Sequence, residues 1–149
     1  MEENVGLKGK FRVAVLGEDG IEKFHRDVPN TVMNAGKKVV SGLILTDIGE
    51  DAFDYIAIGT GTGAPNATQS ALLAEKYRVA GTGSQETTTV TDDTARLTTS
   101  MAITSSVSIT EAGVFNSSSA GDMLARSTFS AVSVNNGDTI NIGYDNVVS

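Results

Sequence analysis

The chain has 149 residues, of which 40% are apolar and 19% charged, and this balance fits one globular domain rather than a disordered segment. It contains no cysteine, so disulfides and cysteine-ligated zinc or iron–sulfur centres are excluded. The net charge of −7 disfavours binding along a phosphate backbone, and no apolar run approaches the roughly 20 residues that cross a bilayer. We therefore expect a single domain over residues 1–149 that binds neither nucleic acid nor membrane.

The N-terminal part of the sequence predicts a short arm followed by a β-hairpin. Residues 1–8 are mostly polar and are expected to form a flexible arm. Phe11, Val13 and Val15 occupy alternate positions, with Arg12 on the opposite face, which is typical of a strand with one buried face. Glu18-Asp19-Gly20 supplies the residues of a tight turn, and a second strand follows. The pattern predicts a hairpin over residues 9–28.

One principal helix is predicted over residues 31–45. Pro29 ends the preceding strand, and Asn30 or Thr31 is suited to cap a helix. The apolar positions that follow recur every three or four residues, namely Val32, Met33, Gly36, Val39, Val40, Leu43 and Ile44. Its glycines lower the intrinsic helix propensity, so we expect packing against a sheet to hold this helix in place.

Residues 55–149 are expected to form a β-rich body. A surface loop rich in Gly follows the strand around Ile56 and Ile58, and Gln69–Tyr77 is predicted to form a short helix with Leu72 and Leu73 facing inward. Beyond it the apolar period is two, at Leu97, Met101, Ile103, Val107 and Ile109, as in half-buried antiparallel strands.

Two late strands complete the predicted fold. Met123–Val134 and Thr139–Asp145 are joined by Asn135-Asn136-Gly137-Asp138, a strong hairpin-turn signal. The sequence thus predicts a mainly β fold, an antiparallel β-sandwich of about seven or eight strands with an N-terminal β-hairpin and one principal packed helix.

The motifs that suggest chemistry are weak. Gly59-Thr60-Gly61-Thr62-Gly63 differs from the dinucleotide-binding spacing and lacks the lysine of a phosphate-binding loop, so we interpret it as a flexible surface loop or an inter-subunit contact. The one histidine, His25, is expected to be an exposed strand residue. The acidic groups at residues 47–54 and 92–93 lack the calcium-loop pattern and indicate solvated turns. We expect no catalytic, cofactor-binding or metal-binding residues and no small-molecule substrate.

Several residues instead suggest contacts that support assembly. Glu75 and Arg78 are spaced to form a local ion pair. Glu111 and Arg126 each stand within an apolar run, which indicates a pair across strands or across subunits. Together with the loop glycines, the candidate assembly contacts are Glu111, Arg126, Glu75, Arg78, Gly59, Gly61 and Gly63.

An ordered set of motifs resembles small virion proteins of tailed bacteriophages, including modules described as capsid decoration, tail-fibre or tail-collar proteins. The resemblance covers nearly the whole chain, including Asn34-Ala35-Gly36-Lys37 and an aromatic, Tyr144, in the final strand. The other segments that carry it are Ala57-Ile58-Gly59-Thr60-Gly61, Leu72-x-x-Glu75-x-x-Arg78, residues 109–116, Met123-Leu124-Ala125-Arg126 with Phe129, and Gly137-Asp138-Thr139-Ile140-x-Ile142.

This resemblance implies a non-enzymatic structural protein of the virion, assembled in the host cytoplasm. Because the chain has no fibre shaft or coiled coil of its own, we expect a capsid decoration protein that docks on the shell and on neighbouring copies through β-edges and loops. The implied partners are copies of itself, in a trimer or another symmetric homo-oligomer, and the major capsid or tail proteins. The alternatives are a tail, neck or baseplate subunit, a receptor- or glycan-binding module, and a small hydrolase.

Overall fold

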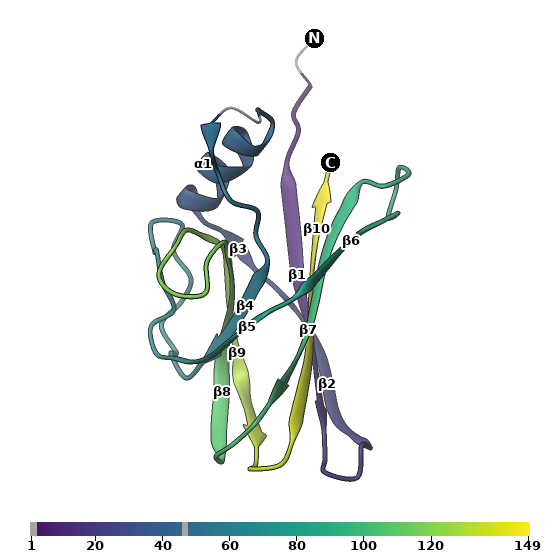
Figure 1. The fold of residues 1–149 in the computed structure, drawn as a ribbon, viewed down its shortest axis with the longest axis vertical. Coiled ribbons are helices and arrows are strands. Elements are labelled where there is room, and N and C mark those ends of the chain that lie inside the picture. Colours follow the sequence, from purple (N-terminus) through teal and green to yellow (C-terminus); the bar gives the residue numbers. More distant parts are fainter. Residues whose placement is uncertain (1–2, 46–47) are drawn as a thin grey trace.

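The computed structural model describes residues 3–45 and 48–149, and this part of the chain forms ten strands and one helix in two antiparallel sheets (Figure 1). The strands are β1 (Leu7–Leu16), β2 (Glu22–Pro29), β3 (Thr31–Val32), β4 (Tyr55–Gly59), β5 (Glu75–Ala80), β6 (Thr82–Glu86), β7 (Thr94–Ala102), β8 (Val107–Phe115), β9 (Met123–Val134) and β10 (Thr139–Val148). The helix α1 spans Asn34–Leu43. The mainly β sandwich with one helix is therefore confirmed.

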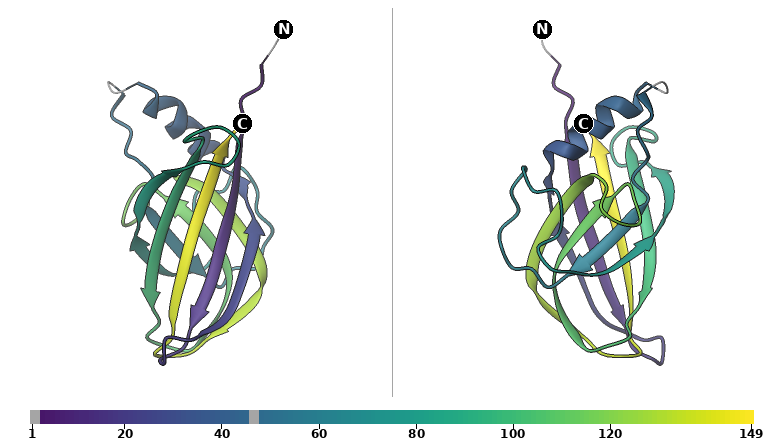
Figure 2. Two further views of the ribbon diagram at one scale, coloured as in Figure 1. Left: turned by 90° about the vertical axis from the view of Figure 1, so that its right-hand side faces the viewer. Right: turned by 60° about the vertical axis from the view of Figure 1, so that its left-hand side comes forward.

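The two sheets are connected at both sides by chain segments that pass from one sheet to the other. The first sheet has the order β2-β1-β10-β7-β6 and the second has the order β3-β9-β8-β4-β5. At one seam β2 continues through Asn30 into β3, and at the other β5 continues through Gly81 into β6 (Figure 2). These two bent segments each contribute a strand to both sheets, which is why ten strands occur where seven or eight were expected.

Side-chain hydrogen bonds connect the two sheets at both of these seams. The Arg26 guanidinium donates to the carbonyl oxygen of Ser130 at 3.0 Å. At the opposite seam the Thr99 hydroxyl donates to the carbonyl oxygen of Ala80 at 2.8 Å. The edge of each sheet is thus largely faced by the edge of the other, which limits strand addition by another chain.

The predicted hairpin and the predicted apolar alternation form the core between the sheets. Phe11, Val13 and Val15 on β1 are all buried, and β1 pairs with β2 in antiparallel register. Their cross-strand neighbours on β10 are also buried, so the first sheet presents one continuous apolar face to the second. Gly20 adopts a positive φ of 76° in the predicted turn, a conformation that favours glycine.

Helix α1 is shorter than the predicted range of 31–45. Thr31 and Val32 pair with β9 as strand β3, so neither Asn30 nor Thr31 caps the helix, and the expected cap is wrong. Met33 occupies the N-cap position without a capping side-chain hydrogen bond. The helix packs on β9, and a Cβ on Gly36 would lie only 2.7 Å from the Leu124 backbone. Glycine at this position thus lets the helix backbone lie close to β9, and this packing compensates for the poor helix propensity of glycine.

The short helix predicted at Gln69–Tyr77 does not form. The chain runs as a loop to Ala74, and β5 starts at Glu75 and pairs with β4. Long-range strand pairing and hydrogen bonds to a buried carboxylate replace the local helical preference here. Leu72 is buried, as expected, whereas Leu73 is 54% exposed.

The N-terminal arm is also shorter than expected. Leu7 and Lys8 belong to β1 and pair with Val148 and Val147 of β10, so the predicted arm ends at Gly6. Gly6 and Ser149 exchange two backbone hydrogen bonds, which hold the C-terminal residue beside the start of β1 (Figure 1). Within residues 3–45 and 48–149 there is no helix of the length and apolarity needed to span a membrane.

Candidate assembly surface

A fully buried ion pair lies on the outer face of the second sheet. Glu111 on β8 and Arg126 on β9 each have 0% side-chain exposure. The guanidinium Nε and Nη2 atoms of Arg126 donate to Glu111 Oε2 at 2.9 and 2.8 Å. The two residues predicted to pair across strands or subunits therefore pair across two strands of one chain.

The Glu111 carboxylate also holds both ends of the loop between β4 and β5. Its Oε1 atom accepts the backbone N–H groups of Gly61 at 2.9 Å and Ala74 at 2.7 Å, and Oε2 accepts the N–H of Leu73 at 3.0 Å. Burial alone would raise the pKa of Glu111, but the Ala74 N–H, the Arg126 guanidinium and the other two backbone donors together lower it. The carboxylate is therefore ionised and fully hydrogen-bonded at neutral pH.

The rest of the Arg126 side chain binds the same loop. Its Nη1 atom donates to the carbonyl oxygen of Gly63 at 2.8 Å and to Gln69 Oε1 at 3.1 Å. The ion pair and the loop form one buried polar network with good hydrogen-bond geometry. Both charged side chains are buried, so they cannot contact another subunit directly. They can support assembly only by holding this loop in place, and that role stays a prediction.

The loop glycines are explained by close packing. A Cβ on Gly59 would lie 2.4 Å from the Ala74 carbonyl oxygen, and one on Gly61 would lie 2.6 Å from Glu111 Oε1. A Cβ on Gly63 would lie 2.7 Å from Leu73. These glycines let the backbone approach the buried carboxylate, so the segment predicted to be flexible is fixed by contacts at both ends.

Arg78 fixes a second loop on the same face. Its guanidinium pairs with Glu75 at 2.6 Å, which confirms the predicted ion pair. It also lies over the Phe115 ring at 3.7 Å from the centroid and donates to the carbonyl oxygens of Ser117 and Ala120, both at 2.9 Å. Sequence reasoning missed these contacts, because the loop from Asn116 to Asp122 carries no pattern that points to a distant arginine.

A second, smaller apolar cluster lies beneath the two loops. It consists of Met33, Ala57, Leu72, Phe115 and Met123, all buried. Leu72 comes from the first loop, and Phe115 is the last residue of β8, directly before the second, so this cluster joins both loops to the second sheet. The outer face of the second sheet is thus covered by loops, whereas its inner face forms the main core.

The surface that these loops present is uncharged. Residues 60–74 and 116–121, which we call the loop surface, contain no Asp, Glu, Lys or Arg, although the chain as a whole is 19% charged. Exposed residues on it are Thr62, Gly63, Ala64, Asn66, Thr68, Ser70, Ala71, Leu73, Ser118, Ser119, Ala120 and Gly121. Depletion of charge is a mark of the centres of protein–protein interfaces.

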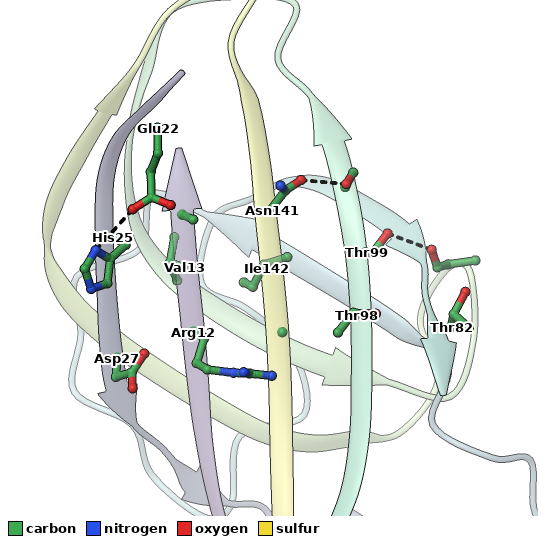
Figure 3. Close-up of a pocket in the computed structure, with 14 residues that line it drawn as sticks. Arg12, Val13, Glu22, His25, Asp27, Thr82, Thr98, Thr99, Asn141 and Ile142 are labelled. Carbon is green, nitrogen blue, oxygen red and sulfur yellow. Dashed lines mark hydrogen bonds and ion pairs between the residues drawn. The ribbon is translucent and has the colours of Figure 1, made fainter. Parts of the chain in front are cut away.

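The outer face of the first sheet carries a broad hollow of about 800 Å³ (Figure 3). Its lining includes Arg12, His25, Asp27, Thr98 and Asn141. His25 is 75% exposed and has its Nδ1 atom 3.2 Å from Glu22 Oε1, whose side chain is 52% exposed. His25 is thus the exposed strand residue that was expected, and the hollow gives it no shielding from water of the kind catalytic groups use.

The described residues of the two acidic segments form no cluster of potential metal ligands. Asp47 lies outside the described residues, and Glu50 pairs with Lys38 at 3.4 Å. Asp93 accepts three backbone hydrogen bonds from Thr88, Thr89 and Val90, and these bonds lower its pKa. Across residues 3–45 and 48–149, no group of three or more His, Asp or Glu side chains is arranged to hold a metal ion.

No family model, curated protein or solved structure that was compared with the chain matches it. The resemblance to phage virion proteins therefore stays a prediction, but four of the segments on which it rests can be located in the fold. The segments around Gly59, Leu72, Glu111 and Met123 all come from the second sheet or its loops. These four segments meet around the Glu111–Arg126 pair and support the loop surface, whereas Thr139–Ile142 of a further segment belongs to β10 in the first sheet.

Proposed function

We propose that this protein is a non-enzymatic structural component of a tailed-phage virion, a capsid decoration protein that docks through its loop surface. One observation carries the proposal. The chain has a net charge of −7, yet its buried Glu111–Arg126 network holds in place a loop surface that contains no charged residue. Fixing the loops before binding reduces the entropy lost on association. An uncharged surface also lets acidic copies approach one another without strong repulsion.

The fold favours loops over β-edges as the docking element. Both seams of the sandwich are occupied by bent segments that belong to both sheets. Few strand edges are therefore free to add a strand from another chain. Docking through side chains and loops, repeated by the symmetry of a particle, gives firm attachment from individually weak contacts.

The experiment introduces charge into the loop surface. Ala71→Glu and Ser118→Glu place a carboxylate at exposed positions in the two loops, and Ser133→Glu, on an exposed position of β9 away from the loops, is the matched control. We expect the loop variants to reduce the copies per purified particle at least about tenfold, which corresponds to about 1.4 kcal/mol of binding free energy. The control should assemble normally.

Quantitative mass spectrometry against the major shell protein gives the readout. A copy ratio near one, or a simple fraction of it, supports decoration of the capsid. A few copies in multiples of three or six would move the protein to the tail, neck or baseplate. Its absence from particles would refute the virion proposal and favour the binding-module and hydrolase alternatives, the latter tested by His25→Ala.

A further inference from the structure

Leu73 is the one large apolar side chain that the loop surface exposes. It is 54% exposed, whereas the neighbouring Leu72 is 7% exposed and belongs to the smaller apolar cluster. The exposed residues directly before it, Ser70 and Ala71, are small and uncharged. A single exposed apolar residue is common on proteins and indicates nothing by itself, so the way in which this one is held is more informative.

The backbone at Leu73 is fixed by the buried carboxylate beneath it. The Leu73 N–H donates to Glu111 Oε2 at 3.0 Å, and the Ala74 N–H donates to Oε1 of the same carboxylate at 2.7 Å. The Ala74 carbonyl oxygen accepts the N–H of Thr60 at 2.9 Å, which joins the two ends of the loop. Since Glu111 is paired with Arg126 and both side chains are buried, a network closed to solvent determines the position of Leu73.

Two glycines make room for the Leu73 side chain. A Cβ on Gly61 would lie 2.6 Å from Leu73 Cβ, and one on Gly63 would lie 2.7 Å from Leu73 Cδ1. Any larger residue at these two positions would push the leucine aside. One flank of the side chain thus packs beside glycine backbone, while about half of it stays exposed. A side chain that is restricted before binding loses less conformational entropy when a partner covers it.

These features together are those of a binding anchor. Solubility alone would favour a charged or polar residue at such an exposed place. The chain instead has an aliphatic side chain on a firmly held backbone, in surroundings free of charge. Binding interfaces use a central aliphatic or aromatic anchor that enters a pocket of the partner, and charged residues are depleted around their centres.

The surroundings of Leu73 also restrict the chemistry of the partner. Residues 60–74 and 116–121 contain no Asp, Glu, Lys or Arg, so this surface cannot neutralise a charged group brought against it. Burying such a group without a counter-charge is costly. The matching site is therefore an apolar recess with a rim of uncharged hydrogen-bonding groups.

We infer that Leu73 is the anchor of the loop surface and inserts into an uncharged, apolar recess of the major shell protein. The inference rests on the proposed docking function, which places the shell against this surface. It adds the residue that contributes most to docking and the kind of site that receives it.

The test measures binding of the purified chain to purified particles that lack it, by co-sedimentation. Leu73→Ala should weaken binding about 10- to 100-fold, the loss expected when a leucine buried at an interface is truncated. Leu73→Met keeps the volume and should lose less than about tenfold. Leu73→Asn, of similar size but polar, should bind no better than Leu73→Ala.

Ile21→Ala is the matched control, since Ile21 is 66% exposed and lies between β1 and β2, outside the loop surface. It removes a comparable aliphatic side chain and should leave binding unchanged. Thermal unfolding of each variant checks the fold, and truncation of these exposed side chains should move the melting temperature by less than about 4 °C.

The anchor and the docking function fail in different ways. Unchanged binding in Leu73→Ala, together with loss of binding in Ala71→Glu, would overturn the anchor and leave the loop surface as the docking site. An equal loss in Leu73→Ala and Ile21→Ala would also overturn the anchor. Self-association that depends on Leu73, without binding to particles, would overturn the shell as its partner and assign a second copy. If the wild-type chain neither binds particles nor self-associates, the anchor fails together with the docking function.

Discussion

Replacement of Arg126 by Met tests whether the buried ion pair holds the loop surface. Methionine keeps most of the side-chain length but leaves the Glu111 carboxylate buried with its three backbone donors alone. Removing one partner of a buried ion pair costs about 3–5 kcal/mol. For a chain of this length each kcal/mol lowers the melting temperature by about 2–4 °C, so we expect a decrease of roughly 6–20 °C.

The assay combines thermal and denaturant unfolding with limited proteolysis by thermolysin. The loop contains Leu72 and Leu73 as cleavage sites, so release of the loop should speed cleavage there. Lys10→Met is the matched control, because the Lys10–Asp27 pair spans 3.5 Å with both side chains about half exposed. Exposed pairs contribute at most about 1 kcal/mol.

A double-mutant cycle separates the charge from the packing. Arg126→Met combined with Glu111→Gln leaves no unpaired buried charge, so the double variant should be more stable than the sum of the single effects predicts, by at least about 1 kcal/mol. A loss below about 1 kcal/mol in Arg126→Met, together with unchanged loop cleavage, would refute the view that this pair holds the loop.

Two further predictions concern the same network. Gly61→Ala places a Cβ against Glu111 Oε1 and Leu73 and should cost about 1–3 kcal/mol, whereas Gly83→Ala, whose Cβ has no neighbour closer than 3.9 Å, should change stability little in the same denaturant series. Equal effects would contradict the close-packing argument. Because the folded pKa of Glu111 is lowered, its contribution to stability is present above the unfolded pKa of about 4.3 and is lost as pH falls through the folded value. Unfolding curves from pH 7 to pH 2 should therefore show a smaller loss in Glu111→Gln than in the wild-type chain, and parallel curves would contradict this assignment.

The elements that the sequence predicted well are those fixed by local pattern. Phe11, Val13 and Val15 alternate, and the Asn135–Asp138 turn has its Gly137 at a φ of 94°, so both could be inferred from neighbouring residues alone. The helix predicted over Gln69–Tyr77 failed because its leucines and Glu75 have good helical propensity, while strand pairing with β4 decided the outcome.

The site could be predicted only in part. Glu111 and Arg126 stood out as charged residues inside apolar runs, which was a usable signal of a buried pair. Their other partners are backbone groups of a loop far away in the sequence, and no side-chain pattern encodes these. The glycines at 59, 61 and 63 could have indicated that this loop binds the pair, since an uncharged Gly-rich loop can approach a buried carboxylate closely.

The pairing of β1 with β10 also determines when the fold can form. Leu7 to Leu16 pair with Val148 to Thr139, so the first sheet requires residues from both ends of the described chain. The hairpin of β1 and β2 can form early from local contacts, but its other edge stays unpaired until β10 has been synthesised. Such pairings between distant residues slow folding. Until β10 is available, the free edge of β1 is where a chaperone or another unfolded chain would bind.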